Sequence, residues 1–239
     1  MWSISEYSPT ALFSLRPANA TTSGGKSLIL PTPFAIKMAL LDAAIRVYGR
    51  EQAELWFPII RDLAIAIDLP ELVMVNNTFV KILRPHKGGA KDVYGTGLIG
   101  PMGSTIAYRE MVQFGGVLKI ALQEQPSTIY STPLQSLVQQ ITYLGKRGGF
   151  MQITNVVDAE DLPQGFIRLN DTEIAQFPVG GLMQIMDDCG PKMTFEQADV
   201  YSGKSIGINK PNGRILRPIV LPYRQIRASR GYTLYERMG

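Results

Sequence analysis

Two segments of the chain open with the same device: a threonine and a proline, followed by apolar residues at helical spacing. The first runs from Thr32 to Gly49 and the second from Thr132 to Gly145. Threonine caps free backbone N–H groups at a helix start, and proline fits the first turn because the N–H that it lacks would be unpaired there. Glycine is a common residue at a helix end. We therefore expect two amphipathic helices, each packing one apolar face on a core.

Strand-like segments flank these two helices. They are rich in β-branched and apolar residues and cover residues 10–17, 72–83, 105–122, with a break at Gly115–Gly116, and 150–157. The order β-α-β-β-α-β is that of a ferredoxin-like (RRM-type) domain, in which two helices cover one face of a four-stranded antiparallel sheet. The predicted fold class is therefore α+β, with the other face of the sheet free for a second duty.

Two parts of the chain lie outside this minimal unit. Residues 84–104 separate the second and third strands and hold six glycines and two prolines, so we expect an inserted loop or irregular hairpin that projects from the sheet. Short strand signals, with a turn at 210–213, predict a smaller β-rich lobe near the C-terminus. The expected organisation is a ferredoxin-like domain over 1–157, with its insertion at about 84–104, followed by the lobe over 158–239.

The scarcity of cysteine and histidine excludes most catalytic and metal sites that are built from these residues. The chain has one cysteine, Cys189, and one histidine, His86, whereas a zinc site recruits three or four ligands. The motif GxxxxGK[ST] is absent from the sequence. We expect no catalytic residue, no metal and no cofactor. Since one cysteine forms no internal disulfide and no apolar run approaches ~20 residues, we expect a cytoplasmic protein without a membrane partner.

The net charge of +4 is distributed unevenly along the chain. Lysine and arginine gather at 81–91, in the glycine-rich "GKRGG" at 145–149, and as six arginines from Arg214 to Arg237, whereas acids gather at 158–161. Charge segregated in this way suits a surface that binds a polyanion such as RNA. The alternative is that each cluster is simply a solvated basic face.

Three motifs resemble those of one protein family. They are "LILPTPFAIKMALLDAAI" (28–45), "STIAYREMV" (104–112) and "YLGKRGGF" (143–150). They resemble the first helix opening, the strand after the inserted thumb and the glycine-rich loop of the CRISPR-associated "five" family, within the repeat-associated RNA-binding superfamily. The resemblance covers roughly the first two-thirds of the chain. It departs from the family at Lys37, where many members have a small residue.

The resemblance implies a non-catalytic subunit of a type I CRISPR Cascade effector complex, which binds and caps the 5′ handle of the CRISPR RNA (crRNA). Such a subunit grips the handle between its ferredoxin-like palm and its inserted thumb. It also contacts the first copy of the backbone subunit and the large subunit of the complex. Target DNA is a further candidate partner.

Basic, aromatic and glycine residues of the motifs and the insertion are the candidate RNA contacts. Glycine lets a phosphate approach the backbone closely, lysine and arginine supply charge, and tyrosine or arginine can stack on bases. The candidates are Lys26, Lys37, Arg84, Lys87, Lys91, Tyr108, Arg109, Gly145, Lys146, Arg147, Gly148 and Gly149. The apolar thumb tip, which we expect to meet a partner or to wedge between bases, contains Ile99, Pro101 and Met102.

Lys37 lies in the early turns of the first predicted helix, where a cation opposes the helix dipole by about 0.3–1 kcal/mol. A phosphate bound at the helix start would remove this mismatch, because the backbone N–H groups and the ammonium would both face the anion. The alternative is that Lys37 reaches solvent.

Two other functions remain open at this point. In one CRISPR subtype, members of the resembled family cleave precursor RNA without metal, using a tyrosine, a lysine and a histidine. The same residue types occur here as His86, Lys87, Tyr94 and Tyr108, although a lone histidine beside glycines is more often solvent-exposed than a general base. The chain could instead be an interaction protein whose basic patches meet an acidic partner. RNA backbone and an acidic protein face are both partners that would suit Arg224, Arg227 and Arg230.

Overall fold

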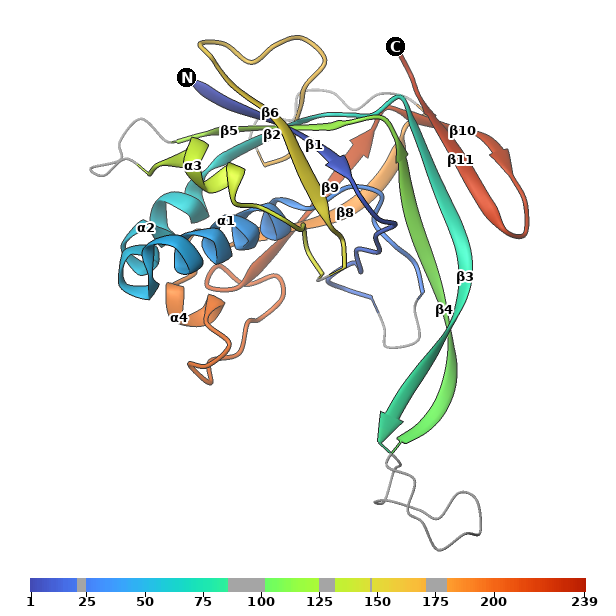
Figure 1. Ribbon diagram of the computed structural model, residues 1–239, viewed down its shortest axis with the longest axis horizontal. Helices are drawn as coiled ribbons and strands as arrows, with labels where there is room; N and C mark the ends of the chain where they lie inside the picture. The colour runs from blue at the N-terminus through green and yellow to red at the C-terminus, as the bar shows by residue number, and fades with distance from the viewer. Residues whose placement is uncertain (21–24, 86–101, 125–131, 147, 171–179) are drawn as a thin grey trace, which may run out of the picture.

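The structure is a computed structural model that describes residues 1–20, 25–85, 102–124, 132–146, 148–170 and 180–239. Its strands form three antiparallel sheets, and three of its helices lie together on one side of the largest sheet (Figure 1). The predicted α+β class is confirmed. Among the described helices, none is long and apolar enough to cross a lipid bilayer.

The largest sheet has five strands in the order β6-β1-β5-β2-β7. Its strands are β1 (Trp2–Pro9), β2 (Ala64–Asp68), β5 (Leu118–Gln123), β6 (Met151–Ala159) and β7 (Ile167–Arg168). The helices on one face of this sheet are α1 (Pro33–Tyr48), α2 (Arg50–Asp62) and α3 (Leu134–Gln139). Most buried apolar side chains of these strands and helices belong to one core, and a smaller separate cluster contains Trp2, Ile4, Ala66 and Ala121.

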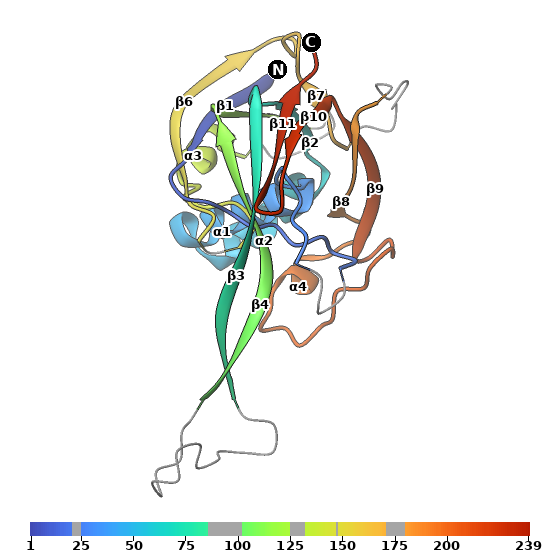
Figure 2. The ribbon, with the colours of Figure 1, turned by 90° about the vertical axis from the view of Figure 1, so that its right-hand side faces the viewer.

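The second sheet has four strands in the order β10-β11-β3-β4. Its long strands are β3 (Leu72–Pro85) and β4 (Met102–Gly115), and its short ones are β10 (Tyr223–Ala228) and β11 (Tyr232–Arg237). Because β11 pairs with β3 along residues 72–76, the rest of β3 extends with β4 from the body as a two-stranded projection (Figures 1 and 2). We call residues 77–85 and 102–110 the arm.

The third sheet is a pair of strands, β8 (Leu182–Cys189) and β9 (Arg214–Leu221), with the short helix α4 (Phe195–Ala198) between them in the chain. β8 packs against α1, and Met186 and Leu221 belong to the same core as the α1 side chains. The chain after residue 158 thus contributes strands to all three sheets. The division into a domain and a C-terminal lobe stays a prediction.

Several local predictions are confirmed. Thr32 accepts a hydrogen bond from the backbone N–H of Ala35 at 3.1 Å, and Pro33 is the first residue of α1. The strand break is confirmed between β4 and β5, where Gly116 has a φ of 150°. The turn at 210–213 is confirmed by a backbone hydrogen bond that closes it.

The predicted strand at 72–83 is confirmed as β3, although in another sheet than predicted, and the predicted strand at 10–17 is wrong. The first strand of the main sheet is β1, whereas the predicted strand at 10–17 makes isolated bridges, at Phe13 and Leu15. In the main sheet β2 takes the place predicted for 72–83, which lies instead in the second sheet. Residues 2–5 of β1 alternate apolar and serine residues, a strand signal that the prediction did not use.

The helices also differ from the prediction. α2 is absent from the prediction, and it follows α1 after a single glycine, Gly49. The second predicted helix is shorter than expected, because α3 ends at Gln139. Ile141 and Leu144 are buried even so, through the turns that follow the helix. The apolar spacing therefore predicted correctly that these two residues are buried, although they do not lie in a continuous helix.

Candidate nucleic-acid interface

A cavity of about 320 Å³ lies at the start of α1. Its walls include residues 14–16, the first two turns of α1, residues 143–146, and Arg214 at the start of β9. Segments that are far apart in the sequence therefore meet at one helix end.

The start of α1 gives this cavity a positive electrostatic potential. The first turn contains no acidic residue, and the first N–H groups of a helix have no partner within the helix. Thr32 satisfies one of them, the N–H of Ala35, and Pro33 has no N–H to satisfy. The helix dipole adds about half an elementary charge at this end. The backbone alone therefore favours an anion here.

The turn that contains Gly145 closes the cavity from another side. Gly145 has a φ of 76°, a left-handed conformation that glycine adopts readily. A Cβ atom at this position would lie 2.3 Å from Leu15 Cδ2 and 3.9 Å from Ala35 Cβ, so the turn packs directly against both neighbouring segments. A Cβ at Gly149 would lie 3.0 Å from a main-chain oxygen of the same turn, whereas Gly148 is exposed with open space around it.

Three cations lie at the cavity: Arg16, Lys146 and Arg214. Lys146 is exposed. The guanidinium of Arg214 stacks on the Phe34 ring, with Cζ 4.0 Å from the ring centroid, and its Nη1 donates to Asp187 Oδ2 at 3.2 Å. Since Asp187 is the one carboxylate among the described lining residues, the lining carries a net positive charge.

Two cations of this site, Arg16 and Arg214, were not among the residues predicted from the sequence. Arg214 comes first in the C-terminal run of arginines, and its side chain is 32% exposed, enough to meet a ligand. Its stacking on Phe34 depends on β9 returning to the start of α1, a contact between residues 180 positions apart. The run of arginines was the available signal, and it did not indicate which member would reach the helix.

The environment of Lys37 agrees with neither alternative that the sequence raised, a bound phosphate or exposure to solvent. Its side chain is buried, and its Nζ donates to Asp188 Oδ1 at 2.6 Å. Asp188 also accepts hydrogen bonds from the Cys189 N–H at 2.7 Å and from Asn170 Nδ2 at 3.2 Å. The ammonium therefore reaches neither solvent nor the cavity, because β8 brings a carboxylate to it inside the core. Lys37 joins α1 to β8, and we remove it from the candidate RNA contacts.

A second group of candidates lies at the base of the arm. Lys26 is exposed and forms an ion pair with the buried Glu110 at 2.7 Å, and this hydrogen bond raises the pKa of Lys26. Tyr108 makes an edge-to-face contact with Phe79, with ring centroids 5.8 Å apart. Arg109 is half-buried, and its Nη1 donates to the Tyr108 carbonyl at 2.8 Å.

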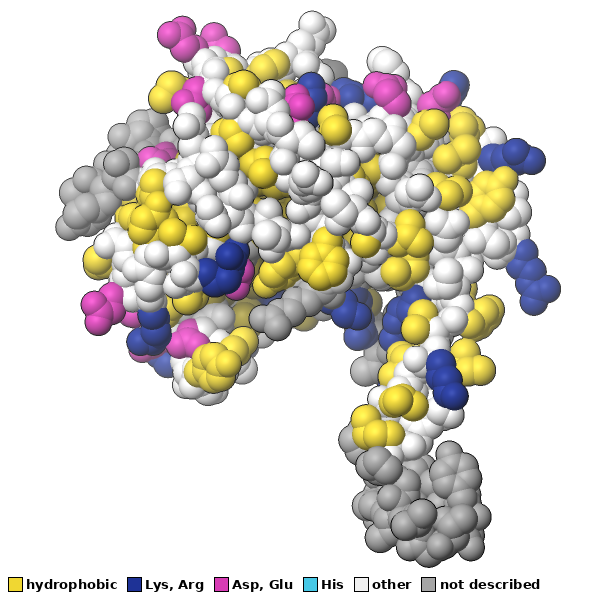
Figure 3. Space-filling view, viewed as in Figure 1, with side chains coloured by type: hydrophobic (Ala, Val, Ile, Leu, Met, Phe, Trp, Pro, Cys, Tyr) yellow, Lys and Arg dark blue, Asp and Glu magenta, His cyan; other side chains and the backbone are white. Residues whose placement is uncertain are grey.

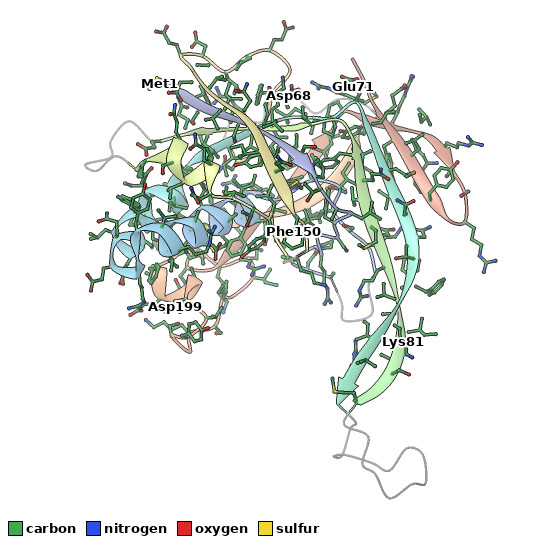
Figure 4. The ribbon with its side chains drawn as sticks, viewed as in Figure 1. Met1, Asp68, Glu71, Lys81, Phe150 and Asp199 are labelled. Carbon is green, nitrogen blue, oxygen red and sulfur yellow. The ribbon has the colours of Figure 1, made fainter. Side chains whose placement is uncertain are left out.

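The described part of the arm displays both charge and apolar surface. Arg84 and Met102 are exposed at its far end, and Lys81 lies between them and the body (Figure 4). Phe79 and Ile106 are 76% and 73% exposed. Figure 3 shows apolar side chains and cations side by side along the arm. Five candidates lie outside the described residues, as do His86 and Tyr94; the five are Lys87, Lys91, Ile99, Pro101 and Arg147.

The cysteine offers no nucleophile at this site. Burial raises the pKa of the Cys189 thiol to about 12, so the thiol stays protonated at neutral pH, and a protonated thiol is a poor nucleophile.

The fold and these features define an α+β protein with a positively charged cavity at a helix start and a projecting two-stranded arm. No protein-family model matches the sequence. The chain is 26% identical over 199 residues to the CRISPR-associated protein Cas5 of Archaeoglobus fulgidus, covering 82% of each chain. The chain is a homologue of that protein.

Two solved structures are similar in outline. A crystal structure of a CRISPR protein from Archaeoglobus fulgidus superposes with a TM-score of 0.45 and 11% identity, covering 100% of this chain and 92% of that one. A chain of a CRISPR RNA-guided surveillance complex superposes with a TM-score of 0.40 and 10% identity, covering 79% and 77%. Both scores are low, so the relationship depends on the sequence similarity.

Proposed function

We propose that this protein is a non-catalytic subunit of a type I CRISPR Cascade effector complex, which binds and caps the 5′ handle of the crRNA. In that role it also contacts the backbone and large subunits during RNA-guided DNA targeting. The proposal combines the homology to Cas5 with one structural observation. That observation is the cavity at the start of α1, where the positive end of the helix dipole, a glycine turn and three cations converge.

The chemistry of the cavity supports a nucleotide phosphate as its occupant. Helix N–H groups and arginine both bind phosphate oxygens, the first through the helix dipole and the second through its planar fork of donors. Arg214 is held in place by Phe34 and Asp187 before any ligand arrives, so less conformational entropy is lost on binding. At Gly145 the Leu15 side chain occupies the space that a Cβ atom would need, so the glycine lets this turn pack closely against the cavity wall.

We further propose that part of the main sheet is the ferredoxin-like palm. Along the chain, β1, α1 with α2, β2, β5, α3 and β6 follow the order β-α-β-β-α-β, and four strands lie in the order β6-β1-β5-β2. This is the arrangement expected of two interleaved β-α-β units. The arm, inserted between β2 and β5, corresponds to the thumb, with Arg84 as a phosphate contact.

The test is binding of the full chain to a synthetic RNA that carries the repeat-derived 5′ handle, measured by fluorescence anisotropy across a salt series. Lys146→Glu places an acid at the cavity, so we expect about tenfold weaker binding and a salt slope reduced by about 1. Lys192→Glu is the matched control, because Lys192 is also exposed and is not part of the cavity.

Equal affinities for the Lys146→Glu and Lys192→Glu variants would refute the placement of the handle at the cavity. The RNA should be recovered intact after incubation in EDTA. Specific cleavage that is lost in His86→Ala would refute the non-catalytic role.

A further inference from the structure

The sheet β10-β11-β3-β4 has a covered face and an outer face. Along β3, Val73 and Val75 are buried, as are Val112 and Phe114 on β4, and these side chains belong to the core. Strand residues alternate between the two faces of a sheet. The residues between them, such as Gln113, are exposed or half-buried and form the outer face.

Strand register places several arginines on this outer face. Arg227 pairs with Leu234, which pairs with Met74 of β3, so all three share the face of Gln113 rather than that of Val112. By the same register and alternation, the remaining arginines of the outer face are Arg84, Arg109 and Arg224.

Acids do not balance these cations. Among the described residues of the four strands, the acidic residue on the outer face is Glu236, and it is bonded to Arg224 at 2.6 Å. Arg227 is exposed, and so is Arg230 in the turn between β10 and β11. The Arg230 carbonyl accepts from Asn77 Nδ2 at 3.0 Å, so this turn is fixed where the arm begins. Figure 3 shows cations on this hairpin and on the arm beside it.

We propose that this outer face, centred on Arg227 and Arg230, is a second surface that binds the phosphodiester backbone of a nucleic acid. Charge complementarity supports the assignment, because the excess of arginine over acid attracts a polyanion. The length of the surface favours a nucleic acid over an acidic protein patch. Arg227 is in register with Met74 of β3, and Arg84 lies further along the same strand. The surface between them therefore covers about ten residues of strand, or about 30 Å. A phosphate backbone presents charge continuously over such a length.

This surface is distinct from the cavity. The cavity is built by α1, residues 14–16, the Gly145 turn and β9, whereas the outer face is built by the second sheet. Arg84 and Arg109 also belong to the arm, whereas Arg227 and Arg230 belong to neither the cavity nor the arm. The inference is centred on these two arginines and therefore does not rest on handle binding. The phosphodiester could belong to duplex DNA or to single-stranded RNA beyond the handle, and the experiment separates these two sources.

The test uses the full chain with the double substitution Arg227→Ala/Arg230→Ala and two labelled probes, a short DNA duplex and a single-stranded RNA unrelated to the handle. We expect about tenfold weaker binding of one probe and a salt slope lowered by about 1–2, as for the loss of two phosphate contacts. The probe that loses affinity identifies the source of the phosphodiester. The handle RNA should keep its affinity within about twofold, since neither arginine lies at the cavity.

The matched control is Arg46→Ala/Arg50→Ala, which removes the same charge from the helical side of the molecule, where both arginines pair with acids. The proposal is refuted if the wild-type chain binds neither probe, or if both double variants bind the probes equally. A loss restricted to the handle RNA would make these arginines part of the handle site and would also refute it. Poly-glutamate that competes as well as the nucleic acid would identify an acidic protein partner and refute it as well.

Discussion

At the residue scale, the most consequential side chain is Lys37. The sequence marked it as unusual, because a cation in the first turns of a helix needs a reason. Its partner Asp188 is 151 positions away, so no local pattern could name it. The two side chains are 2% and 4% exposed. Removing one member of such a buried pair leaves an uncompensated charge inside the protein.

We predict that Lys37→Met lowers the free energy of unfolding by about 3 kcal/mol, because Asp188 would remain buried without its closest cation and would keep only the longer 4.0 Å pair with Arg217 Nε. Urea denaturation followed by circular dichroism measures this change. Arg46→Met is the control on the same helix. Its ion pair with Asp42 is partly exposed and its Nη2 also donates to the Gln140 carbonyl at 2.7 Å, so the variant should cost about 1 kcal/mol or less. Equal denaturation midpoints for the two variants would contradict this view of Lys37.

Adding Asp188→Asn to Lys37→Met should restore part of the lost stability. The double variant removes the buried carboxylate together with its closest cation, whereas the single variant leaves that carboxylate behind; Arg217, whose Nε lies 4.0 Å from Asp188 Oδ2, keeps the rescue partial. A double variant less stable than Lys37→Met alone would show that Asp188 acts mainly through its other partners, Asn170 and the Cys189 N–H.

At the element scale, the glycine turn and the start of α1 act as one unit. Local chemistry was sufficient to predict α1, because Thr32, Pro33 and Gly49 each have a defined role at a helix end. It was insufficient for α2, which contains Pro58 in its interior, a position where proline normally ends a helix. The alternation of serine with apolar residues in residues 2–5 is itself a strand signal, and the prediction did not use it; Ser3 and Ser5 are buried in β1.

We predict that Gly145→Ala destabilises the protein more than Gly148→Ala does. Both glycines have positive φ, 76° and 104°, so alanine is strained at either position, by about 1–3 kcal/mol. Only at Gly145 does the new Cβ also collide with a neighbour, Leu15. Gly145→Ala should therefore also weaken handle RNA binding. Identical urea midpoints and RNA affinities for the two variants would show that this close approach has no consequence.

At the scale of the whole molecule, the cavity lies in the body and the arm projects from it. Long-range pairing decides this arrangement: β10 and β11 extend the sheet of β3, and β9 delivers Arg214 to α1. The sequence indicated basic clusters and a glycine turn, and the structure brings the turn, Lys146 and Arg214 together. The sequence alone could not indicate which arginines meet α1 and which lie on the outer face of the second sheet. Strand register decides that, and register depends on contacts across the whole chain.

The most direct measurement of the central claim is photo-cross-linking of the full chain to handle RNA that carries photoreactive uridines, with the attachment sites mapped by mass spectrometry. We predict cross-links in residues 14–16, in residues 143–150 and on the arm. Cross-links confined to the exposed face of α2, around Leu55, would contradict the account, because that face shares no residue with the cavity or the arm.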